Sequence, residues 1–264
     1  MERLGEVLFL LASSDRMKLL SDLEKGDLRM TDLAGRLGAS VQETSKHLGR
    51  LAEGGLIEKG ASGTYKLTPF GRVVLDLTPS LGFVAEHRDY FLTHDISSLP
   101  NDLLTRIGEL AENSYVDHVT NVITECQHLL GMAREYFYLV LDQPLPWSLK
   151  RELPETMSVR GIFQSDISPA SYQLGRSILG PRAEIRFAES IKISFAVNEK
   201  IGGVVFPDLT GRPDYSCGFL GHEAAFQNWC VDLFERFWEN AMTSWPKQLE
   251  ASYPDRGNSP RARI

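Results

Sequence analysis

The pattern that most constrains this chain is a pair of short helical repeats separated by a tight turn within residues 30–53. Apolar residues recur at helical spacing on both sides of Gly38, a residue type that adopts a left-handed conformation without steric cost. Thr31 is positioned to cap the first helix, and Ser40 to cap a second helix expected over 41–53. Two short helices joined by a glycine-bearing turn are typical of a helix-turn-helix.

The residues on either side extend this pattern. Residues 56–59 and 64–68 have the character of two strands, and the Gly60-Ala-Ser-Gly63 connection between them suits the tip of a β-hairpin. Upstream, residues 2–12 and 15–24 carry leucines at helical spacing. Helices, turn, helix and hairpin in this order predict a winged helix-turn-helix.

Two phrases in this region resemble those of known regulators. Leu48-Gly-Arg-Leu-Ala-Glu-Gly-Gly-Leu-Ile and Tyr65-Lys-Leu-Thr-Pro-Phe-Gly resemble the segments that precede and follow the wing in ArsR- and MarR-like regulators. The resemblance covers roughly residues 5–75. It implies a DNA-binding domain, which we assign to residues 1–75.

Helix 41–53 is the expected recognition helix, because the major groove accepts one α-helix and hydrogen-bonding side chains read its base edges. Gln42 suits adenine and Glu43 suits cytosine, whereas Arg50 suits a phosphate. Its inward face is expected to hold Val41, Thr44 or Ser45, Leu48 and Leu51. For each polar residue the alternative is a solvated face without a DNA role.

Cations beside the hairpin are expected to meet the DNA backbone or the minor groove. His47 is expected to contact solvent or a phosphate. The complete set of expected DNA-binding residues is Thr31, Ser40, Gln42, Glu43, Ser45, Lys46, His47, Arg50, Lys59, Ser62, Lys66 and Arg72.

The charge distribution is compatible with this assignment. The net charge is −7, but residues 1–70 hold ten Lys/Arg and ten Asp/Glu, whereas the rest of the chain holds 18 and 25. Phosphates respond to the local potential, so a neutral domain with well-placed cations still binds DNA. The acidic remainder is expected to suppress non-specific binding to nucleic acid.

The second half of the sequence alternates strand-like and helix-like segments, which predicts an α/β domain with a small mixed sheet over 101–250. We expect strands over 136–141, 157–164, 183–188, 191–197 and 203–206, and helices over 121–134, 147–152, 171–179 and 222–245. Residues 76–100 are expected to form a helical linker and dimerisation segment in which Pro79 kinks or restarts the helix. Residues 251–264 are expected to form a disordered tail.

Four phrases in this half, 183–189, 204–211, 214–219 and 226–239, resemble the effector domain of archaeal methanogenesis-type regulators. That domain is similar to the phospholipase-D-like sensor domain of TrmB-like regulators. The resemblance implies transcription control gated by a ligand or a partner. It also implies a non-catalytic domain, because none of the six histidines is followed two residues later by the lysine that phospholipase-D chemistry needs.

No enzyme activity, cofactor or metal is expected. A methyl-donor or dinucleotide site needs a glycine-rich turn between strand and helix, and neither Gly202-Gly203 nor Gly175 and Gly180 fit that place. The three cysteines include no C-x-x-C pair, which favours free thiols in a reducing cytoplasm. A ligand site near strand ends is expected to include Arg186, Asp208, Asp214, Tyr215, Phe219 and Trp229, with core packing as the alternative for Phe219 and Trp229.

The leading hypothesis is therefore a cytoplasmic, homodimeric transcriptional regulator that binds double-stranded DNA and responds to a small-molecule effector. A symmetric dimer would read a pseudo-palindrome. One alternative is a winged-helix module that binds other proteins of the transcription machinery. Another is a small-molecule methyltransferase with a winged-helix dimerisation domain. No apolar run is long enough for a membrane span, and no secretory signal is expected.

Overall fold

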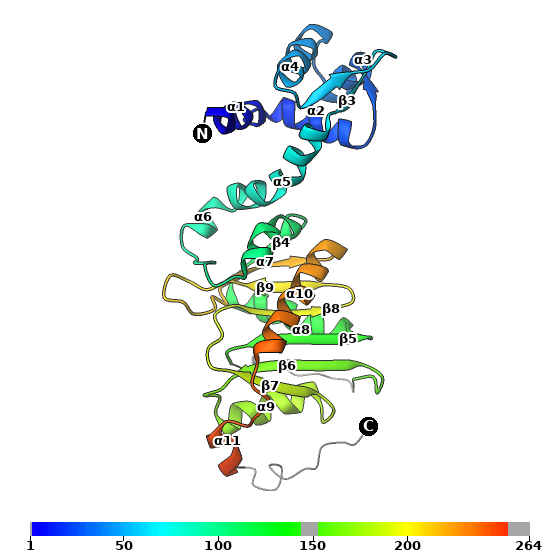
Figure 1. The fold of residues 1–264 in the computed structure, drawn as a ribbon. Coiled ribbons are helices and arrows are strands. Elements are labelled where there is room, and N and C mark those ends of the chain that lie inside the picture. Colours follow the sequence, from blue (N-terminus) through cyan, green and yellow to red (C-terminus); the bar gives the residue numbers. More distant parts are fainter. Residues whose placement is uncertain (1, 144–152, 253–264) are drawn as a thin grey trace. The chain divides into compact units, whose positions relative to one another are not determined.

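The computed structural model describes residues 2–143 and 153–252. The chain divides into two compact units, Met1–Leu81 and Gly82–Ile264 (Figure 1). Among the described residues, no helix has both the length and the apolar character that crossing a membrane requires.

The first unit is a winged helix-turn-helix, as predicted. Its three-stranded antiparallel sheet has the order β1-β3-β2. Gly38 ends α3 in the left-handed conformation, with φ 70°, and starts the turn to α4. The elements are α1 (Glu2–Leu11), α2 (Ser14–Glu24), β1 (Leu28–Arg29), α3 (Met30–Leu37), α4 (Val41–Glu53), β2 (Ile57–Lys59), β3 (Thr64–Leu67) and the start of α5 (Pro69–Glu86).

One leucine-rich cluster forms the core of this unit, and it includes Leu33, Leu48, Leu51 and Leu56. A buried cation joins α1 to α2. The Arg16 guanidinium donates to the carbonyl oxygens of Leu10 and Phe9, each at 2.6 Å. These carbonyls lack partners within α1 because they belong to its last turn, so Arg16 satisfies them.

Helix α5 is continuous from Pro69 to Glu86, so it does not restart at Pro79, which was one of the two outcomes expected there. Proline has no N–H, so the carbonyl of Leu75, four residues earlier, loses its usual donor. The Thr78 hydroxyl donates to that oxygen at 2.5 Å. This substitution of a side-chain donor for a backbone donor explains why the helix continues.

Gly71 sits where α5 passes closest to the start of the wing. A Cβ placed on it would lie 1.9 Å from the Leu56 carbonyl oxygen. That oxygen accepts from the Thr68 N–H, and the Thr68 hydroxyl in turn accepts from the Gly71 N–H. Gly71 ends the Tyr65–Gly71 phrase, and a side chain is excluded here because two backbone segments approach each other closely.

Gly71→Ala is expected to lower the free energy of unfolding by about 3 kcal/mol, because backbone must shift to admit one methyl group. Gly82→Ala is the matched control in the same helix, since nothing lies within 4 Å of its added Cβ. Better helix propensity should stabilise that variant by up to about 1 kcal/mol. Urea unfolding of the two variants measures both effects, and equal stabilities would contradict this explanation.

The second unit is built on a seven-stranded mixed sheet with the order β4-β10-β9-β8-β5-β6-β7. Strands β5, β6 and β7 are parallel, whereas the pairs from β5 through β8, β9 and β10 to β4 are antiparallel. The strands are β4 (Ser114–Asp117), β5 (Tyr136–Leu141), β6 (Ser158–Gln164), β7 (Glu184–Ala188), β8 (Ser194–Asn198), β9 (Gly202–Val205) and β10 (Cys217–Gly221).

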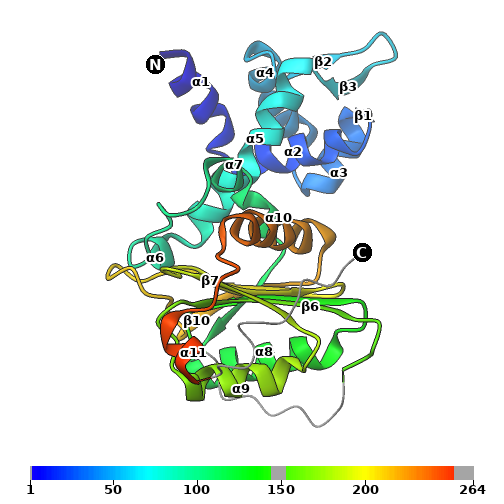
Figure 2. The ribbon, with the colours of Figure 1, turned by 60° about the horizontal axis from the view of Figure 1, so that its bottom comes forward.

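Helices cover both faces of this sheet, as Figure 2 shows. On one face α10 packs its aromatic residues, including Phe226 and Trp229, into a core shared with Phe83 and Tyr90. On the other face α8 and α9 enclose a second core that contains Leu129 and Tyr172. The helices are α6 (Arg88–Phe91), α7 (Asn101–Thr105), the 3-10 helix η1 (Ile107–Leu110), α8 (Val119–Met132), α9 (Pro169–Leu179), α10 (Ala224–Asn240) and α11 (Lys247–Ser252).

The mixed α/β prediction is confirmed, and the five expected strands all occur. The sheet is larger than expected because β4 and β10 pair at one edge. The expected linker 76–100 also differs, since Phe83, Tyr90 and Leu99 lie in the core of the second unit. The expected helix 147–152 and the tail from residue 253 onward fall outside the described residues, and 251–252 end α11.

Candidate functional site

The start of α4 is held by a reciprocal capping box. The Glu43 N–H donates to the Ser40 hydroxyl oxygen at 3.2 Å, and the Ser40 N–H donates to the Glu43 carboxylate at 3.1 Å. Hydrogen bonds from the Ser40 side chain and backbone hold the pKa of Glu43 below its usual value. Both residues were expected to contact DNA, but the structure uses them to begin the helix. The Glu43 carboxylate is thus engaged at the start of α4, and its suggested cytosine contact stays a prediction.

The outward face of α4 carries the remaining polar candidates. Gln42, Ser45, Lys46 and Arg50 are all exposed. Within the described part of the chain, neither Lys46 nor Arg50 has a carboxylate within 4.0 Å. Neither cation therefore forms an ion pair among the described residues, although Glu43 lies close enough to Lys46 for their charges to interact.

The inward face of α4 is narrower than predicted. Thr44, Leu48 and Leu51 are buried, whereas Val41 is 52% exposed and does not join the core. Thr44 tolerates burial because its hydroxyl donates to the Ser40 carbonyl at 3.0 Å. Val41 is the first residue of α4, and its side chain stays exposed there.

His47 turns toward α2 and is not a free surface group. Its Nε2 lies 3.6 Å from the Asp15 carboxylate in the first turn of that helix. The side chain is half-buried, at 22% exposure, and its Nδ1 has no hydrogen-bond partner among the described residues. The expected phosphate contact for His47 is therefore a weaker prediction than those for Lys46 and Arg50.

On the wing, two of the expected cations already have partners. Lys66 pairs with Glu58 across the hairpin at 3.0 Å, and this contact raises its pKa. Lys59 lies over the ring of Tyr65, with its ammonium 5.8 Å from the centroid. Ser62 bonds to Thr64 at the tip.

Two further candidates lie away from α4. Thr31 is exposed in α3, but Arg29 occupies the N-cap position that was expected for it. Arg72 is exposed in the first turn of α5. The structure therefore corrects the capping role of Thr31 and leaves its DNA contact a prediction.

In the second unit, two of the tentative ligand residues belong to the core. Trp229 is fully buried, and its indole N–H donates to the Leu103 carbonyl at 3.0 Å. Phe219 is 1% exposed and packs edge-on against Phe83 and Tyr90. Both residues thus follow the alternative of core packing that was given for them from the sequence.

Arg186 and Asp208 also serve local structure. The Arg186 guanidinium stacks on the Trp238 ring, 4.2 Å from its centroid, and donates to the Trp238 carbonyl at 2.6 Å. Asp208 accepts from the N–H and hydroxyl of Thr210 at 2.8 and 2.6 Å. Hydrogen bonds with Thr210 hold the pKa of Asp208 below its usual value.

The sheet order separates the six tentative residues. Arg186 lies on β7, at one edge, whereas Asp214, Tyr215 and Phe219 lie on or just before β10, with four strands between. At about 4.8 Å per strand, that is on the order of 24 Å. One ligand pocket formed by all six is therefore wrong.

Asp214 and Tyr215 each join a different polar cluster. The Tyr215 hydroxyl bonds to Ser194 at 2.8 Å and donates to the Asp142 carboxylate. Asp214 instead meets His94 and Cys217, residues that sequence analysis did not select. The Asp-x-x-Cys spacing of 214–217 was a usable signal, but His94 is 120 positions away in the chain.

Among the comparisons with known proteins, the match to a family model lies near the N-terminus. Residues 4–87 match the family described as HVO_A0261 N-terminal domain. The methanogenesis regulatory protein FilR1 of Methanothrix harundinacea (strain 6Ac) is 25% identical over 251 residues, which cover 86% of this chain and 55% of that protein. The chain thus spans about half the length of this curated relative.

Two solved structures are also similar. TrmBL2, described as an archaeal chromatin protein, is 14% identical, covers 92% of this chain and 100% of its own, and has a TM-score of 0.41. The homodimeric winged helix-turn-helix domain of Mb0332 from Mycobacterium bovis is 26% identical, covers 33% of this chain and 82% of its own, and has a TM-score of 0.30. Residues 4–87 of this chain therefore carry the HVO_A0261 N-terminal domain, and most of the chain is similar to a protein named as a methanogenesis regulatory protein.

Proposed function

We propose that this protein is a sequence-specific DNA-binding transcriptional regulator that places α4 in the major groove. The observation that carries the proposal is the outward face of α4, where Lys46 and Arg50 are exposed and have no acid partner among the described residues. The similarity to a regulatory protein over 86% of the chain supports the same function.

The contacts divide by chemistry. Gln42 and Ser45 carry amide and hydroxyl groups that suit base edges, whereas Lys46 and Arg50 suit phosphates. Lys59 and Arg72, beside the wing and in α5, extend the phosphate-binding surface. Lys66 contributes less because Glu58 already neutralises it.

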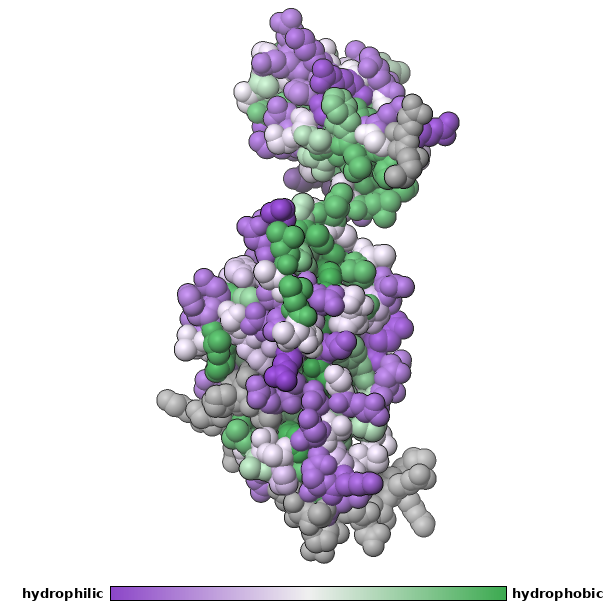
Figure 3. Space-filling model, turned by 90° about the vertical axis from the view of Figure 1, so that its left-hand side faces the viewer, coloured by the Kyte–Doolittle hydropathy of each residue, from purple (hydrophilic) through white to green (hydrophobic). Residues whose placement is uncertain are grey.

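We also propose that the protein acts as a homodimer through α1 and α5. Phe70, Val73, Leu77 and Leu81 recur at spacings of three or four residues, so they share one face of α5. Their exposed fractions are 49%, 57%, 73% and 56%. Helix α1 adds Leu4, Leu8 and Phe9 at 55%, 43% and 65%, and hydrophobic residues gather on this side of the first unit in Figure 3.

An apolar stripe of this size favours a second copy as its occupant. Soluble monomers rarely leave such a row of large side chains in water. A two-fold axis would place identical stripes against one another and set two α4 helices on successive half-sites. The second unit is proposed to sense a ligand or a partner and not to catalyse a reaction.

Selection of bound sequences from a random DNA pool tests the main proposal. We expect an enriched pseudo-palindrome with half-sites about one helical turn apart. Gln42→Ala should relax the preference at one base position by about 1–3 kcal/mol, while Lys200→Ala, in the second unit, should leave it unchanged. A pool without any enriched motif would favour the alternative of a protein-interaction module.

A further inference from the structure

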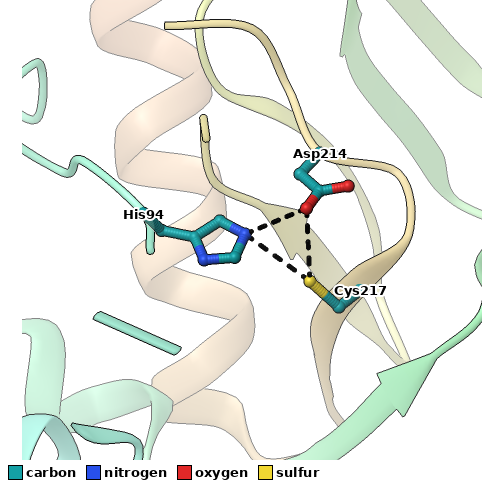
Figure 4. A group of neighbouring side chains, drawn as sticks. All are labelled: His94, Asp214 and Cys217. Carbon is teal, nitrogen blue, oxygen red and sulfur yellow. Dashed lines mark hydrogen bonds and ion pairs between the residues drawn. The ribbon is translucent and has the colours of Figure 1, made fainter. Parts of the chain in front are cut away.

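Three metal-ligating side chains from distant parts of the chain converge in the second unit. His94 Nε2 lies 3.2 Å from Asp214 Oδ2 and 3.5 Å from Cys217 Sγ, and the sulfur lies 3.8 Å from the same carboxylate oxygen. Figure 4 shows the three groups pointing toward one another. His94 and Cys217 are buried, at 8% and 7% exposure, and Asp214 is half-buried.

Backbone hydrogen bonds fix the segments that carry these residues. The Asp214 N–H donates to the Phe206 carbonyl at 3.1 Å, and Cys217 pairs with Asp117 as β10 begins. On the other side, the Asp95 N–H donates to the Pro207 carbonyl at 3.0 Å, beside the bridge between His94 and Asp208. These backbone interactions therefore hold in place the segments from which the three side chains project.

The orientation of His94 is also fixed. Its Nδ1 lies 2.9 Å from the Tyr90 carbonyl oxygen, and its ring stacks on the Tyr90 ring with centroids 3.7 Å apart. The Thr93 hydroxyl also lies 3.1 Å from Nδ1. In the tautomer that suits a metal, Nδ1 donates to the Tyr90 carbonyl and Nε2 presents a lone pair toward Asp214 and Cys217. Metal-bound histidines characteristically have this arrangement, with the second ring nitrogen donating to a carbonyl or carboxylate.

The distances match one face of a tetrahedron around zinc. With bonds of about 2.0 Å to nitrogen and oxygen and about 2.3 Å to sulfur, tetrahedral angles separate nitrogen from oxygen by about 3.3 Å and sulfur from either by about 3.5 Å. The corresponding separations here are 3.2, 3.5 and 3.8 Å. Closing around an ion therefore needs movements of only a few tenths of an ångström.

From this geometry we propose that His94, Asp214 and Cys217 bind one Zn²⁺ ion. Imidazole and thiolate donors select zinc and similar transition metals over Mg²⁺ and Ca²⁺, which prefer oxygen ligands alone. Cys217, Ser216 and Tyr115 line an open hollow on the surface. A fourth ligand, water or a small molecule, would enter from that hollow. The proposal stands independently of DNA binding.

The charge balance favours this ion. Binding replaces the S–H bond of the Cys217 thiol with a zinc–sulfur bond and releases the proton to solvent. One dipositive ion with a thiolate, a carboxylate and a neutral imidazole gives a cluster of zero net charge, which limits the cost of its burial. The competing state is a metal-free pair between protonated His94 and Asp214.

Titration of the full-length, tag-free protein with Co²⁺, and then with Zn²⁺, tests the site. We expect one ion per chain, a thiolate-to-cobalt charge-transfer band that Zn²⁺ abolishes, and release of about one proton per ion. Cys217→Ser should remove the band and weaken Zn²⁺ binding by more than about 100-fold. Cys126→Ser is the matched control, because this cysteine lies outside the cluster and should leave both unchanged.

A stability measurement guards against a variant that merely misfolds. At 100 times the dissociation constant, Zn²⁺ should raise the thermal midpoint of the unaltered protein by roughly 5–10 °C. Asp214→Asn should keep a cooperative transition but lose most of this rise. The metal-free ion pair would be the correct interpretation if Cys217→Ser bound Zn²⁺ as tightly as the unaltered protein, or if cobalt gave no thiolate band.

Discussion

Leu77→Glu is expected to convert the protein into a monomer and to weaken its binding to a palindromic DNA site by more than about 100-fold. Leu77 is 73% exposed at the centre of the apolar stripe on α5. In a symmetric dimer each glutamate would face the same stripe of the partner, so two charges would be buried without partners. A monomer binds one half-site at a time, so it loses the affinity that a dimer gains by binding two half-sites together.

Sedimentation and gel-shift titration measure the two effects in one preparation. Leu209→Glu is the matched control, because Leu209 is 70% exposed but lies in the second unit, between β9 and β10. That control should remain dimeric and bind DNA normally. A dimeric Leu77→Glu variant with normal DNA affinity would show that the stripe has another occupant.

Replacing both Lys46 and Arg50 by alanine is expected to weaken binding to every DNA sequence. Each lost phosphate contact should make the slope of log affinity against log salt shallower by about 0.9, which near physiological salt is about fivefold in affinity. Loss of two phosphate contacts in one half-site should then lower the DNA affinity about 30-fold, and a dimer loses twice as many contacts. Sequence preference should survive, because these residues are assigned to phosphates and not to bases.

Gel shifts at several salt concentrations, with specific and random duplexes, separate charge from readout. Lys66→Ala should lower the DNA affinity much less than either change in α4, because the Lys66 ammonium already pairs with Glu58 at 3.0 Å. An unchanged salt slope in the Lys46/Arg50 double variant would mean that α4 does not lie against the DNA backbone. Equal losses for Lys66→Ala would instead place the wing at the centre of the interface.

The winged helix could be predicted from sequence because its signals are local. Gly38 starts the turn, Ser40 caps α4, and a four-residue tip joins the two wing strands, all within 30 positions of the chain. The side chains were harder to assign. Glu43 was expected to read a base, yet its carboxylate accepts a hydrogen bond from the Ser40 N–H at the start of its own helix.

In the second unit, the sequence patterns predicted some of the strands but not others. Strands such as β5 are continuous apolar runs and were predicted, whereas β4 has the sequence Ser-Tyr-Val-Asp, is mostly exposed and was missed. It becomes a strand only because β10, a hundred residues later, pairs with it. Core packing was the alternative expected for Trp229, whereas no sequence pattern predicted that Arg186 would stack on Trp238.

By itself, the sequence determined the order of elements, the winged helix and the α/β class, because turns, caps and apolar periodicity act over a few neighbouring residues. The tertiary structure alone decided which polar groups remain available for function. It paired Lys66 with Glu58, left Lys46 and Arg50 without acid partners among the described residues, and brought His94 to Asp214 and Cys217. The pair of Lys66 and Glu58 depends on the register of one hairpin. The meeting of His94 with Asp214 depends on closing a chain segment of 120 positions, which local chemistry does not encode.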